Sequence, residues 1–140
     1  MSSTPDEEPQ NAPQDASAAD EVLAGRRILI VEDDPFIAMA LEDTLLDFGM
    51  SVTGIARNLR EAERQARESV FDVALLDVNI GHDTIDPVAD VVASRGLPFV
   101  FTTGHGRAGL PEAYRDRAIV EKPFYVDEIL RALREELLRS

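Results

Sequence analysis

The sequence predicts an α/β fold of the (βα)5 type, a doubly wound, five-stranded parallel sheet with helices on both faces. Short apolar runs that suit buried strands alternate with segments in which apolar residues recur at helical spacing. Such alternation implies right-handed crossovers and therefore parallel strands. A length of 140 residues suits one domain of ordinary size, and an apolar fraction of 44% is that of a globular protein with a core.

The predicted strands are short apolar runs. The first run contains only aliphatic residues, as expected for a strand that is buried on both faces of a parallel sheet, and the fifth is the weakest. The five predicted strands comprise residues 28–31, 51–56, 73–76, 99–101 and 118–120.

Helical segments lie between the strands. In the first of them, Pro35 suits the first turn of a helix and Gly49 suits its end. Asn58 is a suitable N-cap for the second helix, and the third is expected to end near Gly96. The last helix carries aliphatic residues spaced by four. Apolar residues that define one face of the first and last helices are Ile37, Leu41, Leu45, Phe48, Ile129, Leu133 and Leu137.

Residues 1–24 differ from the rest of the chain. They carry six acidic residues, no basic residue and three prolines, and no large aliphatic side chain lies between Met1 and Val22. A segment of this composition cannot bury enough apolar surface to offset the entropy lost on ordering. We therefore expect a disordered acidic tail over residues 1–24 and a folded domain over residues 25–140.

The overall charge and composition exclude several classes of protein. A formal net charge of −13 argues against a nucleic-acid binder, because phosphate backbones attract basic surfaces. The absence of cysteine excludes disulfides and thiolate metal sites. No apolar run is long enough for a membrane span, and the N-terminus does not resemble a signal peptide. We expect a soluble, cytoplasmic protein.

Polar residues follow four of the predicted strands at their carboxyl ends. In an open parallel sheet, functional groups gather at these ends, near the point where the strand order reverses. With the strand order 2-1-3-4-5, the four ends are neighbours around one cleft. The four segments are Glu32-Asp33-Asp34, Asp77-Val78-Asn79, Thr102-Thr103-Gly104 and Glu121-Lys122-Pro123.

These residue types together indicate phosphoryl transfer. Converging carboxylates suit a hard divalent cation, and an oxygen site with room for water and a phosphoryl oxygen suits Mg²⁺. A lysine and a hydroxyl on the other side can hold the remaining phosphoryl oxygens. Asp77, at the centre, is placed to act as a nucleophile that forms an acyl phosphate.

Simpler roles are open for the single residues. Asp33 or Asp34 suits the cap of the first helix. Lys122, the only lysine beside thirteen arginines, reflects either a general preference for arginine or a position that needs a compact point charge. The combination at four strand ends favours the metal and phosphoryl site over a set of separate structural roles.

Four motifs, I-L-I-V-E-D-D, L-L-D-V-N, P-F-V-F-T-T-G and E-K-P-F, resemble the receiver domain of two-component response regulators over about residues 26 to 138. The resemblance implies that Asp77 is the phospho-accepting aspartate. It also implies that Asp33 ligates Mg²⁺ directly, that Glu32 acts through water, and that Asn79 contributes its backbone carbonyl. Asp34, one position past the acidic pair, is then the helix cap.

The resemblance assigns the remaining positions as well. Thr103 matches the signalling threonine, and Gly104 lies beside the phosphoryl group. Thr102 and Thr103 point to opposite faces of the strand, so they cannot both serve. Lys122 matches the lysine that bridges to the phosphoryl group, and its bond to Pro123 is expected to be cis, as in the family.

The chain departs from the common receiver pattern in three places. Ile119 stands where many receivers carry an aromatic residue that reports phosphorylation. The segment P-F-V-F-T-T-G-H-G resembles the FAT-GUY subgroup of single-domain receivers, which is associated with alphaproteobacterial stress signalling, but has Thr102 in place of Ala. His105, where Gly or Tyr is common, and His82 are expected on loops at the active face, with no role assigned.

Residues 104–117 support only a short helix, around residues 112–115, because they contain three glycines and Pro111. The first part of this stretch, residues 104–110, is therefore expected to be the mobile element that phosphorylation orders or repositions.

The resemblance implies a receiver that takes a phosphoryl group from a phosphohistidine onto Asp77. The donor would be a sensor histidine kinase or a histidine phosphotransfer protein. Because the sequence ends about one helix after Lys122, we expect no output domain. A monomer or weak dimer would act as a phosphate shuttle, a phosphate sink or a protein-binding switch.

Three other functions share parts of this pattern. A flavodoxin-like cofactor binder needs a phosphate loop rich in Gly, Ser or Thr after the first strand, where this chain has E-D-D. A phosphatase of the haloacid dehalogenase type needs a second aspartate two residues after the nucleophile, where this chain has Asn79. A receiver that works as an adaptor without phosphate would have no need for Asp77 and Lys122.

Overall fold

The computed structural model describes residues 21–139, which contain one five-stranded parallel sheet and a separate short hairpin. The strand order of the sheet is β2-β1-β3-β6-β7, so the predicted order 2-1-3-4-5 is confirmed, with β6 and β7 as the fourth and fifth strands. The strands are β1 (Arg27–Val31), β2 (Ser51–Ala56), β3 (Val73–Asp77), β6 (Phe99–Thr103) and β7 (Ile119–Glu121).

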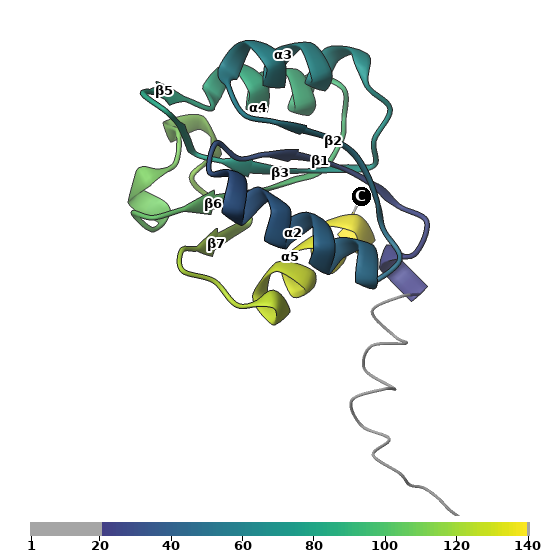
Figure 1. The fold of residues 1–140 in the computed structure, drawn as a ribbon. Coiled ribbons are helices and arrows are strands. Elements are labelled where there is room, and N and C mark those ends of the chain that lie inside the picture. Colours follow the sequence, from purple (N-terminus) through teal and green to yellow (C-terminus); the bar gives the residue numbers. More distant parts are fainter. Residues whose placement is uncertain (1–20, 140) are drawn as a thin grey trace, which may run out of the picture.

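Helices cover both faces of this sheet, as Figure 1 shows. One face carries α3 (Leu59–Glu68) and α4 (Asp86–Ser94), and the other carries α2 (Pro35–Asp47) and α5 (Val126–Arg139). Two apolar layers result, and successive residues of β1 enter opposite layers because strand side chains alternate. Leu29 and Val31 belong to one layer, whereas Ile28 and Ile30 belong to the other.

Two predicted helix caps are confirmed. The Asp34 carboxylate accepts hydrogen bonds from the backbone N–H groups of Phe36 and Ile37, at 2.9 and 3.3 Å, at the start of α2. The Asn58 side chain accepts a bond of 2.8 Å from the N–H of Glu61 at the start of α3. Each cap satisfies N–H groups that have no partner inside the helix.

The boundary predicted for the N-terminal tail is wrong at its inner end. Residues 21–23 are helical, and Leu23 is 0% exposed because it packs into the layer beneath α2 and α5. A hydrogen bond of 2.9 Å from the N–H of Gly25 to the carbonyl of Gly49 fixes this turn. Composition alone did not show that Leu23 would find a place in the core. The disorder predicted for residues 1–20 lies outside the described residues.

The hairpin after β3 was not predicted. It consists of β4 (Asn79–Ile80) and β5 (Asp83–Thr84), which pair in antiparallel fashion. Two-residue strands are too short to leave an alternating pattern in the sequence. Between β6 and β7 the structure has two 3-10 turns, Arg107–Gly109 and Glu112–Tyr114. The second matches the short helix predicted around residues 112–115, whereas the first was not predicted.

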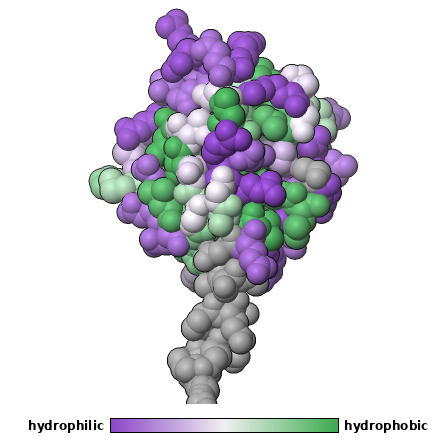
Figure 2. All heavy atoms as spheres, turned by 90° about the vertical axis from the view of Figure 1, so that its right-hand side faces the viewer, coloured by the Kyte–Doolittle hydropathy of each residue, from purple (hydrophilic) through white to green (hydrophobic). Residues whose placement is uncertain are grey.

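The surface of the domain is mixed in polarity. Figure 2 shows hydrophilic side chains gathered at the top of one face, where α3 lies, while apolar and polar groups interleave below it. Two ion pairs between residues four apart run along α3, Arg64 with Glu68 at 3.9 Å and Glu63 with Arg67 at 3.6 Å. No helix within residues 21–139 has the length and apolar character that crossing a bilayer requires.

The burial of Leu23 predicts that the folded domain depends on residues before position 25. We expect Leu23→Ala to lower the free energy of unfolding by about 3 kcal/mol, because it leaves a cavity in a packed layer. Leu46→Ala is the matched control, since Leu46 on α2 is 50% exposed and such surface changes usually stay within about 0.5 kcal/mol. Urea unfolding measures both. Equal effects would contradict the observed boundary.

Candidate functional site

The polar residues predicted to form one site do meet at the carboxyl ends of the central strands. Glu32 follows β1, Asp77 ends β3, Thr103 ends β6 and Lys122 follows β7. Backbone bonds extend the strand pairing up to these ends, including one of 2.8 Å from the N–H of Lys122 to the carbonyl of Thr103. The site is therefore held by the sheet itself.

Three carboxylates form a tight cluster at this edge. One oxygen from each of Glu32, Asp33 and Asp77 lies within 4.8 Å of the others. Glu32 and Asp77 are 1% and 5% exposed, whereas Asp33 is exposed. Among the described residues this is the one group of His, Cys, Asp and Glu side chains with spacing suited to a metal ion.

Backbone N–H groups hold one oxygen of each carboxylate. These bonds fix the orientation of the acids, and Lys122 lies beside the second oxygen of Glu32 and of Asp77. Glu32 Oε2 accepts from the N–H of Asp34 at 3.1 Å, Asp77 Oδ1 from the N–H of Asn79 at 3.2 Å, and Asp33 Oδ2 from the N–H of Gly81 at 2.9 Å.

Lys122 is the cationic partner of the two buried acids. Its Nζ donates a hydrogen bond of 3.0 Å to Asp77 Oδ2 and lies 3.1 Å from Glu32 Oε1. Burial alone would lower the pKa of Lys122, but the hydrogen bonds and charges of Asp77 and Glu32 outweigh burial, so the pKa is raised. Lys122 is therefore fully charged at neutral pH. Its bond to Pro123 is cis, as predicted.

Glu32 is the least satisfied of the acids. Burial raises the pKa of its carboxyl to about 7, with a further contribution from the charge of Asp77, and the Asp34 N–H and Lys122 oppose this rise only in part. Although Glu32 Oε1 is paired in charge with Lys122, it is buried and accepts no hydrogen bond of good geometry from the described residues. Two buried carboxylates therefore share one ammonium, an arrangement that favours a further cation.

The donor set fits Mg²⁺. It offers carboxylate oxygens with no nitrogen or sulfur ligand, and its negative charge exceeds the charge of Lys122. Hard oxygen ligands of this kind are those that Mg²⁺ prefers. Asn79 and Gly104 both lie exposed at the same edge, and the space that a side chain would occupy at Gly104 is open to 4 Å. Their predicted contacts, a carbonyl to the metal and a glycine beside the phosphoryl group, stay predictions.

The Thr103 hydroxyl is engaged by its own loop. Thr103 is buried, and its Oγ1 accepts a bond of 3.0 Å from the N–H of His105 and donates one of 3.4 Å to the carbonyl of Gly106. Thr102 is also buried and lies opposite Asp77 in the register between β3 and β6. The sequence placed Thr103 at the site but gave no signal for this bond to the loop.

Residues 104–117 are held by contacts that sequence analysis missed. The Arg107 guanidinium donates bonds of 2.8 Å to the carbonyls of Arg115 and Arg117. The Tyr114 ring packs edge-on against Phe99, and its hydroxyl donates to Asp90 at 2.5 Å. The alternation of aromatic residues in β6 was the available signal for such a cluster. The expected mobility of residues 104–110 stays a prediction.

The two histidines lie exposed on loops at the rim of the site, as expected. His82 is at the tip of the β4–β5 hairpin, and His105 contributes its backbone N–H to Thr103. Within residues 21–139, neither histidine belongs to a cluster with spacing suited to a metal.

The contact between Tyr114 and Asp90 predicts an unusual alkaline titration. The hydrogen bond to Asp90, with burial, raises the pKa of Tyr114 to about 12. Tyrosinate absorbance measured on Tyr125→Phe, which leaves Tyr114 as the only tyrosine, should therefore rise near pH 12 rather than near about 10. Because the folded pKa is the higher one, this bond stabilises the fold fully below about pH 10 and is lost as the pH rises through 12.

Asp90→Asn in the same background provides the control, since it removes the charge while leaving a side chain of the same size. We expect the Tyr114 titration to move toward the ordinary value for tyrosine. A titration that Asp90→Asn leaves unchanged would show that the contact is not formed in solution.

With fold and site described, comparison with known proteins identifies the class. The sequence profile of the response regulator receiver domain matches residues 28–134. The chain therefore belongs to the response regulator receiver domain family, whose members are signalling proteins of two-component systems rather than conventional enzymes.

Several relatives are similar over most of the chain. The transcriptional regulatory protein PdtaR of Mycobacterium tuberculosis is 32% identical over 77% of the chain, which spans only 55% of PdtaR. The chemotaxis protein CheY of Thermotoga maritima is 30% identical over 78% of the chain and 95% of its own length. The chain thus spans about half the length of one of these relatives and nearly all of the other.

Solved structures agree with this placement. SdrG from Sphingomonas melonis Fr1 is 39% identical, with a TM-score of 0.71 over 84% of this chain and 98% of SdrG. The response regulator PhyR from Brucella abortus is 27% identical, with a TM-score of 0.73 over 90% of this chain and 53% of PhyR. Similarity to SdrG is consistent with the resemblance to the FAT-GUY subgroup.

Proposed function

We propose that the protein accepts a phosphoryl group from a phosphohistidine onto Asp77 in the cytoplasm, in a reaction that depends on Mg²⁺. The observation that carries this proposal is the approach of Lys122 Nζ to Asp77 Oδ2, at 3.0 Å, inside a cluster of three carboxylates. An isolated structural aspartate has no need for a buried ammonium and two further acids around it. A phosphoryl-accepting aspartate needs both.

The transfer is a substitution at phosphorus. A carboxylate oxygen of Asp77 forms a bond to phosphorus as the bond between phosphorus and the donor histidine nitrogen breaks, and that nitrogen keeps the electron pair. Glu32, Asp33 and Asp77, with the Asn79 carbonyl, would hold Mg²⁺. When bound, the metal offsets negative charge on the phosphoryl oxygens. The ammonium of Lys122, which lies beside Asp77, would stabilise the negative charge of a phosphoryl oxygen bound there.

Thr103 is the residue proposed to sense the modification. Its hydroxyl can donate to only one acceptor at a time, and it donates to the Gly106 carbonyl here. A phosphoryl oxygen on Asp77 is a stronger acceptor than a carbonyl, because it carries charge. Turning the O–H toward that oxygen would break the bond to Gly106 and release this part of the loop, with Gly104 giving the phosphoryl group room.

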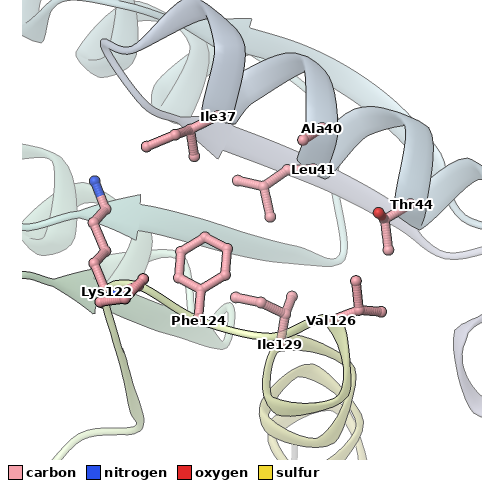
Figure 3. Close-up of a pocket in the computed structure, with 9 residues that line it drawn as sticks. Ile37, Ala40, Leu41, Thr44, Lys122, Phe124, Val126 and Ile129 are labelled. Carbon is pink, nitrogen blue, oxygen red and sulfur yellow. The ribbon is translucent and has the colours of Figure 1, made fainter.

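A pocket beside the site offers a place for the donor protein. It has a volume of about 380 Å³, and it lies between α2 and the start of α5. Figure 3 shows that its walls are apolar and that Lys122 stands at one end. The lining includes Ile37, Ala40, Phe124 and Ile129.

This pocket and the exposed side of α2 support docking of a helical partner that carries the phosphohistidine. Phe36, in the first turn of α2, is 80% exposed, and Met39 is also exposed. Because the pocket is continuous with Lys122, a partner seated there brings its histidine close to Asp77. If the phosphoryl group then returns to a histidine, the protein acts as a phosphate shuttle or sink. If the phosphorylated protein instead binds an effector, it acts as a switch.

The central prediction concerns the accepting atom. After incubation with Mg²⁺ and acetyl phosphate, wild type should show a single phosphoryl adduct in intact-protein mass, and Asp77→Asn should show none. Chelation of Mg²⁺ should abolish the adduct, because the carboxylate cluster then repels the donor. Asp83→Asn is the matched control, since Asp83 is exposed on the nearby hairpin.

An adduct that persists in Asp77→Asn would place the chemistry elsewhere. If no adduct forms in wild type with acetyl phosphate or with a panel of phosphorylated histidine kinases, the phosphorylation proposal is wrong. The protein would then be an adaptor on a receiver scaffold that works without phosphate.

The docking proposal predicts that a change in the pocket slows phosphoryl transfer from a protein donor without affecting phosphorylation of Asp77 by a small molecule. We expect Ala40→Arg to slow transfer from phosphorylated histidine kinases at least tenfold while leaving labelling by acetyl phosphate unchanged, because Ala40 is exposed at the pocket and does not contact Asp77. Leu46→Arg adds the same charge to another exposed position of α2 and should leave transfer unchanged. Equal losses in both variants would indicate a general charge effect instead of a docking site.

A further inference from the structure

The β4–β5 hairpin leaves the site directly from Asp77. Its base is anchored by apolar side chains on either side, since Val78, Ile80 and Ile85 are all buried in the layer beneath α3 and α4. A backbone bond of 3.0 Å from the N–H of Ile85 to the carbonyl of Val78 closes this base. The tip, residues 81–84, is exposed. The hairpin therefore projects from the domain with its base anchored in the core and its tip exposed.

One side of this hairpin faces the carboxylates. The N–H of Asn79 donates to Asp77, and the N–H of Gly81, two residues on, donates to Asp33 at 2.9 Å. Both N–H groups therefore point at the carboxylate cluster, although Gly81 itself lies in the turn after β4. The second bond joins positions 48 residues apart and links the hairpin tip to the loop after β1.

We propose that Gly81 is a positioning residue for the metal, because its N–H holds the Asp33 carboxylate ready to bind Mg²⁺. Asp33 is the exposed member of the cluster, whereas packing already restrains Glu32 and Asp77. With Oδ2 bound to Gly81, Oδ1 is left for the cation. Holding an exposed ligand in place before binding reduces the entropy lost when the metal binds. This inference rests on the proposed function, since it concerns the same metal.

The conformation of Gly81 explains why glycine stands at this position. Its φ is +61°, in the left-handed region that residues with a side chain adopt only with strain. A Cβ built at Gly81 would have no atom within 4 Å. An alanine at this position therefore acts through the backbone of the turn, displacing the N–H, and not through a collision.

The test compares two glycines with the same backbone requirement. Gly96 has a φ of +72° and open space around a built Cβ, but its N–H donates to the carbonyl of Ala93 at the end of α4. Mg²⁺ affinity is measured by calorimetric titration of wild type, Gly81→Ala and Gly96→Ala. Unfolding midpoints should fall to a similar extent in both variants, while only Gly81→Ala should lose affinity, by about tenfold, as expected for an outer-shell partner.

A second measurement examines the bond without metal. Amide hydrogen exchange in metal-free protein should show faster exchange at Gly81 in Asp33→Ala than in wild type, because the acceptor is gone. Exchange at Asn79, whose acceptor is Asp77, should be unchanged. This readout holds even if Gly81→Ala is poorly folded.

The outcomes distinguish this inference from the proposed function. Wild type that binds no Mg²⁺ would overturn the proposed function and the inference with it. Two results would overturn the inference alone. One is an equal affinity of wild type and Gly81→Ala for Mg²⁺, and the other is a rate of amide exchange at Gly81 that Asp33→Ala leaves unchanged.

Discussion

The imbalance of charge at the carboxyl edge of the sheet is the constraint on which the rest of the site depends. Glu32 and Asp77 are buried with a single ammonium between them. Buried charges are costly unless they are paired, so the excess must be relieved by a proton or by a further cation. Burial raises the pKa of Glu32 to about 7, so a proton binds this carboxyl more readily than an ordinary glutamate. A further cation would relieve the excess negative charge, as the proposed binding of Mg²⁺ requires.

The surrounding backbone turns this imbalance into a defined geometry. Strands β1 and β3 are buried on both faces, so the backbone of Glu32, directly after β1, and of Asp77, at the end of β3, cannot shift without disturbing the core. Two loops then treat the site differently. The hairpin after Asp77 donates N–H groups to the carboxylates, whereas the loop after β6 forms hydrogen bonds with the hydroxyl of Thr103. One loop orients the acids, and under the proposed function the other would compete with a phosphoryl oxygen for the Thr103 hydroxyl.

Most of the scaffold could be predicted from local patterns. The aliphatic run that became β1, the caps at Asp34 and Asn58, and the spacing of apolar residues in α2 all reflect interactions within a few residues. Leu23 and the β4–β5 hairpin could not be predicted in the same way. Leu23 is ordered by a core layer assembled from distant segments, and the hairpin is held by Ile80 and Ile85 in the opposite layer.

The sequence by itself determined the order of strands and helices, the caps and the identity of the residues at four strand ends, because each of these follows from side-chain type and local spacing. Only the tertiary structure decided which oxygen meets which N–H, that Thr103 is bonded to its own loop, and that Gly81 reaches Asp33 across 48 residues. These contacts depend on distances between elements that are far apart in the chain. Such distances are set by the packing of two apolar layers against one twisted sheet, which no local pattern encodes.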